Sequence, residues 1–268
     1  MNTKVVLPRE RSGVENYNPR LMVIGGRPKS GKSSFAAAIE SNLIIDLEDG
    51  YRSLRVMKLE ARTAVDLWEI RRAIEEDWRS TGEYPYRCIT IDNATSLEAM
   101  SLQYAAALYR KTPMGQMWGY KSDKYGKPLM QDGKYVIDES SDIRTLPNGS
   151  GYLYLRRALK EMIGWFRPLC ETLILITHIK DKTIRWDNQE MSEMSIDLAG
   201  KSADIICGES DAVGLIYREG RKTWLSFEGG GDFIREARPL HLRGRKFLIA
   251  ESKEGEDELH FNLDGIFI

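Results

Sequence analysis

The sequence contains few cysteines and no long apolar run. Its 268 residues include three cysteines, Cys88, Cys170 and Cys207, which are too few and too scattered for a disulfide framework or a zinc cluster. No stretch approaches the roughly 18 apolar residues of a membrane helix. The first twenty residues also lack the apolar core that is typical of a signal peptide. We therefore expect a soluble, cytoplasmic protein without a membrane partner.

An excess of charge of one sign is also absent. The chain has 39 Lys and Arg residues and 40 Asp and Glu residues, so its formal net charge is −1. This balance argues against a protein that wraps nucleic acid over its whole surface, but it allows a local basic surface. Because 42% of the residues are hydrophobic, the chain can bury a full core, and its length predicts one large domain or two small ones.

Apolar strand-like runs alternate with amphipathic helical runs, which is typical of an α/β fold with a mainly parallel central sheet flanked by helices. Strands are expected at residues 21–25, 43–47, 56–59, 88–91, 173–177, 212–217 and 223–227, the last two forming a hairpin. Helices are expected at residues 32–39, 64–78, 94–109 and 155–166, and a polar loop from 178 to about 196. The expected parts are an N-terminal segment (1–20), a core (21–230) with an insertion or mobile loop at 110–151, and a C-terminal extension (231–268).

Residues 26–33 match the phosphate-loop pattern G-x-x-x-x-G-K-[ST] at every fixed position. Glycines let backbone N–H groups converge on phosphate oxygens. We expect Lys32 to reach the β- and γ-phosphates and the Ser33 hydroxyl to bind Mg²⁺. An apolar strand before the loop and a helix-forming run after it favour this interpretation over a chance glycine-rich turn. The predicted phosphate-binding residues are Gly26, Arg27, Pro28, Lys29, Ser30, Gly31, Lys32, Ser33 and Ser34.

Acidic residues end two further apolar strands. Residues 88–92 read Cys-Ile-Thr-Ile-Asp, and Asp92 supplies the carboxylate that a magnesium–nucleotide site needs near the Ser33 hydroxyl. Residues 44–48 read Ile-Ile-Asp-Leu-Glu, which lets Glu48 face the γ-phosphate from its strand end. The alternatives are a helix-capping role for Asp92 and a solvated acidic turn at residues 48–50.

A third apolar strand, Leu-Ile-Leu-Ile-Thr-His at residues 173–178, ends in a histidine. Because parallel strands present ligands beyond their carboxyl ends, we expect Asp92, Glu48 and His178 to converge on one crevice. There His178 can contact the γ-phosphate and move the segment behind it when the phosphate leaves. The alternative is a structural histidine.

Taken in order, these four segments resemble the RecA-like P-loop ATPases, and most closely the short phage-type members of AAA type that act in single-strand annealing and recombination. The likeness extends over residues 21–227. It implies a RecA-like core, ATP and Mg²⁺ as ligands, and a place in the host cytoplasm if a phage encodes the chain.

The resemblance also implies roles for individual residues. The Glu that matches Glu48 activates water, and the Asp that matches Asp92 supports Mg²⁺. The position of His178 is Gln or Asn in bacterial and eukaryotic recombinases and commonly His in the phage group, where it senses the γ-phosphate and relays to a DNA-binding loop. The residues that would then lie in that loop include Lys180, Lys182, Arg185 and Trp186.

Two basic segments are candidate nucleic-acid surfaces, because such surfaces need cations near phosphates and aromatic rings that stack on bases. Residues 110–151 carry seven positive and five negative side chains, and residues 235–246 carry five positive side chains beside Glu236. The alternatives are a solvated flexible insertion and a decorated helix or hairpin. In residues 110–151 the relevant cations and rings are Trp118, Tyr120, Lys121, Lys124, Tyr125, Lys127, Lys134 and Tyr135.

Lys201 lies in a glycine turn. It is either solvated or directed at a neighbouring protomer's nucleotide.

These patterns favour a Mg²⁺-dependent ATPase that couples ATP binding and hydrolysis to single-stranded DNA binding in phage-type recombination or annealing. The expected partners are single-stranded DNA, a single-strand DNA-binding protein and further copies of the chain in a homo-oligomer. One alternative is a small-molecule kinase, with Arg156-Arg157 or Arg243-Gly244-Arg245 in a lid. The other is a nucleotide-dependent binding switch.

Overall fold

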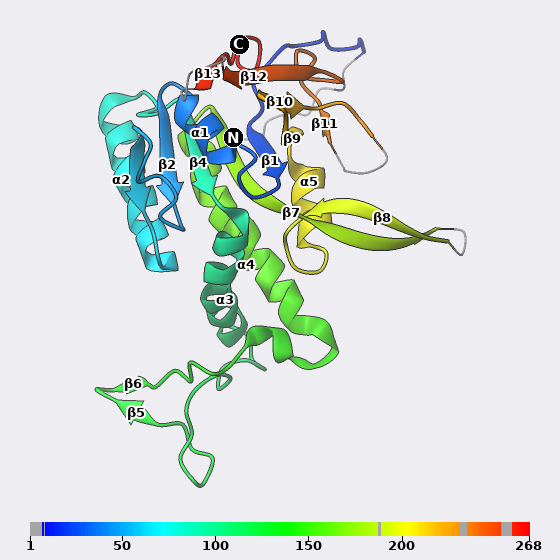
Figure 1. The fold of residues 1–268 in the computed structure, drawn as a ribbon. Coiled ribbons are helices and arrows are strands. Elements are labelled where there is room, and N and C mark those ends of the chain that lie inside the picture. The colour runs from blue at the N-terminus through cyan, green and yellow to red at the C-terminus, as the bar shows by residue number, and fades with distance from the viewer. Residues whose placement is uncertain (1–6, 8, 187–188, 231–234, 253–258) are drawn as a thin grey trace.

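A large, mainly parallel sheet forms the centre of the protein in a computed structural model, which describes residues 7, 9–186, 189–230, 235–252 and 259–268. The sheet order is β13-β12-β10-β9-β1-β7-β4-β2-β3, with β11 paired to β9 and β8 paired to β7. The six parallel strands are β1 (Leu21–Gly26), β2 (Asn42–Asp46), β3 (Met57–Glu60), β4 (Cys88–Asp92), β7 (Thr172–Trp186) and β9 (Ala212–Glu219). The expected α/β fold is thereby confirmed (Figure 1).

Antiparallel strands complete the sheet on the side of β9. They are β10 (Lys222–Ser226), β11 (Glu236–Ala237), β12 (Lys246–Ser252) and β13 (Leu259–Phe261). The β9–β10 hairpin that the sequence predicts is present, with Arg218 opposite Thr223. Strands from the C-terminal extension therefore belong to the same sheet as the phosphate-loop strand.

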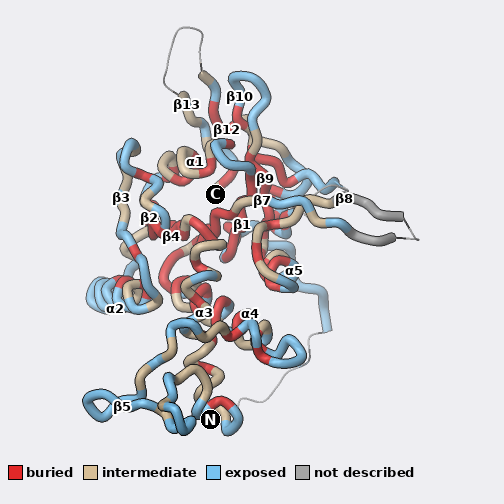
Figure 2. The backbone as a smooth tube through the Cα atoms, turned by 60° about the horizontal axis from the view of Figure 1, so that its bottom comes forward, coloured by how far each residue is buried: buried red, intermediate tan, exposed pale blue. Residues whose placement is uncertain are grey.

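Helices cover both faces of the sheet because successive strand residues alternate between them. One face packs its side chains, including Val23 and Ile91, against α2 (Ala64–Thr81), α3 (Ala94–Arg110), α4 (Ser150–Phe166) and α5 (Ser202–Glu209). The other face, including Ile24, packs against α1 (Lys32–Ala38) and the C-terminal strands. The buried residues consequently lie along the central strands and the inner helix faces (Figure 2).

The segment after His178 forms a hairpin, so the expected polar loop is wrong. Strand β7 continues past the sheet to Trp186 and pairs with β8 (Gln189–Ile196) from Ile179↔Ile196 to Trp186↔Gln189. Figure 1 shows this arm projecting away from the sheet. Lys180, Asp181 and Lys182 are three consecutive charged residues, so the start of this segment lacks the apolar–polar alternation that identifies most strands.

Residues 111–149, between α3 and α4, contain little regular structure. They include a two-stranded sheet of β5 (Met130–Gln131) and β6 (Lys134–Tyr135), and the short 3₁₀ helices Ile143–Thr145 and Pro147–Gly149. This insertion extends away from the central sheet (Figure 1). A third 3₁₀ turn, Arg167–Leu169, follows α4 and ends it at the proline that the sequence indicates.

Candidate nucleotide-binding site

Strand order brings the predicted site residues to one edge of the sheet. Strand β7 lies between β1 and β4, and β4 lies beside β2. In this register Gly26 pairs with His178, while Asp46 pairs with Asp92. The carboxyl ends of these parallel strands therefore meet, which is where α/β sheets bind ligands.

The phosphate loop depends on two glycines for its path. Gly31 has φ 102°, a conformation that disfavours other residues. A Cβ on Gly26 would come within 2.7 Å of the Ile216 carbonyl oxygen, so no larger residue fits beside β9. Both positions are fixed glycines of the phosphate-loop pattern, and the reason in this chain is steric.

Lys32 lies under the loop with its side chain buried. Its ammonium Nζ donates hydrogen bonds of 2.8 Å to the carbonyl oxygens of Gly26 and Arg27. Burial lowers the pKa of Lys32, and the charges of Asp92 and Glu48 act in the opposite direction. Because an ammonium has three donors, one N–H remains available for a phosphate oxygen.

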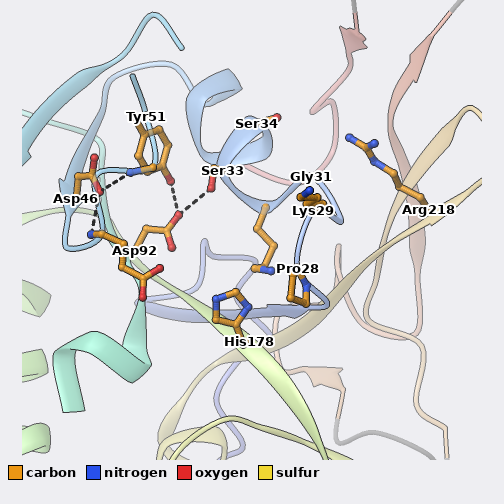
Figure 3. Close-up of a pocket in the computed structure, with 13 residues that line it drawn as sticks. Pro28, Lys29, Gly31, Ser33, Ser34, Asp46, Tyr51, Asp92, His178 and Arg218 are labelled. Atoms are coloured by element: carbon orange, nitrogen blue, oxygen red, sulfur yellow. Dashed lines mark hydrogen bonds between the residues drawn. The ribbon is translucent and has the colours of Figure 1, made fainter. Parts of the chain in front are cut away.

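Ser33, Asp92 and Tyr51 form a connected polar group. The hydroxyls of Ser33 and Tyr51 donate to the same Asp92 oxygen at 3.1 and 2.6 Å (Figure 3). Burial raises the pKa of Asp92, while these two hydrogen bonds and the Lys32 charge lower it. A serine hydroxyl next to a carboxylate is a donor set of the hard oxygen type that Mg²⁺ takes, so these residues fit the metal.

Asp46 ends β2 and Glu48 lies two residues beyond it, and the two side chains differ in their surroundings. Asp46 is buried and accepts hydrogen bonds from the backbone N–H groups of Glu48 and Gly50, and from Lys58. It therefore shapes the turn after β2. Glu48 is exposed, and its Oε1 accepts a 2.7 Å hydrogen bond from the Ser96 hydroxyl on α3.

His178 is the last residue of β7 that pairs with β1. Its ring lies below the phosphate loop (Figure 3). Among the residues that the structure describes, its buried Nδ1 has no hydrogen-bond partner. An unpaired buried ring nitrogen is costly, and a ligand in the adjoining cavity would satisfy it.

A cavity of about 340 Å³ joins these groups. It brings together the predicted residues Lys32, Ser33, Glu48, Asp92 and His178. Three of the predicted phosphate-binding residues do not line the cavity: Gly26, Arg27 and Ser30. The remaining lining residues are Pro28, Lys29, Gly31, Ser34, Asp46, Gly50, Tyr51 and Arg218.

Tyr51 and Arg218 are site residues that no sequence motif indicates. Tyr51 follows the turn after β2, and Arg218 lies near the end of β9 on the far side of the loop (Figure 3). The only signal for Arg218 is its place at the carboxyl end of a strand in the parallel sheet, where ligands bind.

Other predicted residues lie away from the cavity. Lys201 is exposed just before α5. Lys180 and Lys182 lie on β7 in the arm, where they pair with Asp197 and Asp204. The side chains of Arg185 and Trp186 lie outside the described part of the structure.

Comparison with known proteins gives one family. The model of the AAA domain matches residues 18–126, a range that contains the phosphate loop, Glu48 and Asp92. No curated protein matches the chain. In the described residues no helix is both long and apolar enough to cross a membrane. Together with the phosphate loop and the sheet, the AAA match supports a P-loop ATPase.

Proposed function

We propose that the protein is a Mg²⁺-dependent ATPase that couples ATP binding and hydrolysis to single-stranded DNA binding, in recombination or annealing of the phage type. The observation that carries the hydrolytic part is the single cavity lined by Lys32, Ser33, Glu48, Asp92 and His178. These are the cation, the hydroxyl and the acidic groups that phosphoryl transfer to water needs in one place.

Each group has a distinct task in this proposal. Lys32 binds the β- and γ-phosphates, and His178 binds a γ-phosphate oxygen through its unpaired Nδ1. Glu48 orients the attacking water and accepts its proton. Ser33 and Asp92 hold Mg²⁺, which, when bound, neutralises the charge that develops on the phosphate oxygens.

The insertion at 111–149 supports single-stranded DNA as the partner. Tyr125 and Tyr135 are exposed there, and the Lys124 ammonium lies 4.9 Å from the Tyr125 ring centroid. Exposed rings beside cations are suited to stacking on bases and binding the strand's phosphates. In the described residues no ion pair engages the four lysines Lys121, Lys124, Lys127 and Lys134.

The acidic residues of the insertion are largely engaged by its own backbone and side chains. Asp123 accepts from the backbone N–H groups of Tyr125 and Lys127. Asp138 accepts from Ser140, and Asp142 pairs with Arg144. In the described residues these acids form no ion pair with the four lysines, so the lysine ammonium groups stay available to a partner. This supports a basic, aromatic surface on the insertion.

The second basic segment is used within the fold. Arg238 binds Asp211 and the Gly208 carbonyl, and Arg243 donates to the carbonyl oxygens of Ala237 and Arg238. These bonds hold the β11 region against β9. They favour a structural role for this segment over a DNA-binding groove, and they also engage one of the arginines that a kinase lid would require.

An ATP-turnover titration with and without a single-stranded oligonucleotide tests the proposal. We expect weak basal hydrolysis that the oligonucleotide stimulates. Lys32→Ala should abolish it, and Glu48→Gln should reduce it sharply while nucleotide still binds. Stimulation should fall as salt increases, because contacts to phosphates release counterions.

Three outcomes would contradict the proposal. Absence of hydrolysis with and without DNA, at several salt concentrations, would contradict the ATPase activity. Hydrolysis at the same rate with and without DNA would contradict the coupling to DNA. Phosphate transferred to an acceptor rather than released into water would favour a kinase.

A further inference from the structure

Arg218 lies beside the phosphate loop but comes from the opposite side to the acidic groups. It is the seventh residue of β9 and pairs with Thr223 of β10. A Cβ built on Gly31 would lie 3.3 Å from the Thr223 methyl and 3.8 Å from Nη2 of Arg218. The hairpin that carries the guanidinium therefore passes close to Gly31 of the phosphate loop.

The charge of Arg218 is unbalanced. The side chain is exposed and lines the cavity, and in the described part of the chain it has no hydrogen-bond or ion-pair partner. The adjacent carboxylate, Glu219, is 3.7 Å from the Lys246 ammonium instead. A guanidinium that lies at the rim of an anion-binding site and has no protein partner is suited to bind an anionic group of the ligand.

The position of Arg218 also indicates which group of the nucleotide it would bind. His178 lies on β7, Asp92 ends β4 and Glu48 follows β2, so these groups lie on one side of β1. Ser33, at the start of α1, is hydrogen-bonded to Asp92. Together they would hold the metal and the γ-phosphate. Strand β9 is on the other side of β1. Figure 3 shows Arg218 on the opposite side of the phosphate loop from Asp92 and Tyr51. A triphosphate whose γ end lies among the acidic groups would therefore extend its α-phosphate and nucleoside toward the side of Arg218.

We propose that Arg218 binds the α-phosphate of the nucleotide within the same chain. This inference rests on the proposed function and deepens it. Because ATP and ADP both contain an α-phosphate, Arg218 contributes equally to both, and it adds affinity for nucleotide without contacting the γ-phosphate that is transferred.

Equilibrium binding of ATP, ADP and GTP with Mg²⁺ tests this, measured on wild-type protein, Arg218→Ala and Arg218→Lys. For Arg218→Ala we expect all three nucleotides to bind about tenfold more weakly, the lower range for a charge-assisted hydrogen bond. Arg218→Lys should recover part of the loss because it keeps the charge. In turnover, KM for ATP should rise by a similar factor while kcat changes little.

Lys222→Ala is the matched control. Lys222 is an exposed cation on the same hairpin, but it pairs with Glu251 and does not line the cavity. The Lys222→Ala variant should therefore bind nucleotide like the wild type. Unchanged affinity in Arg218→Ala overturns the inference. Loss confined to ATP would move Arg218 to the γ-phosphate, and a changed ATP-to-GTP ratio would move it to the base; both contradict the α-phosphate assignment. If the wild type binds no nucleotide, the proposed function itself fails.

Discussion

The hydroxyl of Tyr51 donates a 2.6 Å hydrogen bond to Asp92, and it lies in a fully buried side chain. Burial and the nearby charge of Asp92 raise the pKa of Tyr51, so the group stays a protonated donor across the physiological range. It therefore fixes the orientation of the carboxylate that faces Ser33.

Tyr51→Phe keeps the ring and removes this one donor. We expect the Mg²⁺ concentration for half-maximal ATP turnover to rise several-fold, because Asp92 loses a partner that orients it. At saturating Mg²⁺ the turnover should approach that of the wild type. A magnesium titration of initial rates measures this, and an unchanged midpoint would contradict the role given to Tyr51.

At the residue scale, the sequence predicts those parts of the site that have a fixed spacing along the chain. Lys32 and Ser33 follow from the loop pattern, and the Ser33–Asp92 hydrogen bond agrees with the expected pairing. Tyr51 and Arg218 reach the cavity only through tertiary geometry. Their neighbours in sequence carry no spacing that distinguishes them from ordinary loop and hairpin residues.

Helix α2 begins with a capping box. The Asp66 N–H donates to the Thr63 hydroxyl, and the Thr63 N–H donates to the Asp66 carboxylate at 2.8 Å. Leu67, Ile70 and Ile74 then lie buried along one face. The apolar period predicts this helix from residue 64, and the capping box is the local reason why it begins there.

Thr63→Ala removes the N-cap and should lower the free energy of unfolding by about 1 kcal/mol. ATP turnover should not change, because neither Thr63 nor any residue of α2 lines the cavity. Chemical denaturation measures the first quantity. Ser80→Ala, which removes an exposed hydroxyl bonded to the Asp77 carbonyl at the other end of α2, is the control and should cost less. Equal losses in the two variants would contradict the capping argument.

The first turn of α3 connects the cavity to the base of the arm. Ser96 binds Glu48, Thr95 donates to the Asp197 carbonyl, and Glu98 accepts from the Ala199 N–H. Residues 197–199 directly follow β8. The position of Glu48 is therefore tied to the segment that ends the β7–β8 hairpin.

Ser96→Ala should lower kcat several-fold and leave KM for ATP nearly unchanged, because Glu48 would lose its orienting partner but bind no substrate phosphate itself. Ser96→Thr keeps the hydroxyl and should restore most of the rate. Steady-state kinetics of the two variants measure kcat and KM for ATP. A rise in KM at constant kcat would contradict this role and show that Ser96 acts on nucleotide binding.

The arm itself shows where element prediction from sequence stops. The buried part of β7, Leu173 to Ile176, is apolar on both faces and is easily identified. Beyond His178 the strand continues through an exposed Lys180, and its pairing with β8 defines it. A pattern that depends on apolar residues does not identify a segment that begins with the charged residues 180–182.

At the scale of the whole molecule, the near-zero net charge conceals an uneven distribution. The insertion presents Lys121, Lys124, Lys127 and Lys134 with exposed tyrosines, far along the chain from the phosphate loop. The number of these charges is known from the sequence, but the groups with which they interact are not. The structure shows which acids are already occupied by hydrogen bonds within the insertion.

Replacing those four lysines by alanine should remove most of the stimulation by single-stranded DNA and reduce the salt dependence that remains, while basal hydrolysis stays at the wild-type level. A variant with Lys160 and Lys222 replaced, both ion-paired elsewhere on the surface, should be stimulated normally. Full stimulation of the four-lysine variant would place the DNA on another surface.

The most direct measurement of the central claim is calorimetric titration of ATP with Mg²⁺ into the folded protein, alongside Lys32→Ala. The account predicts saturable binding at one site per chain in the wild type. Binding should be at least a hundredfold weaker in the variant, because it lacks the buried ammonium that lines the cavity and would bind the β- and γ-phosphates. No heat of binding in wild-type protein whose fold is verified by circular dichroism would contradict it.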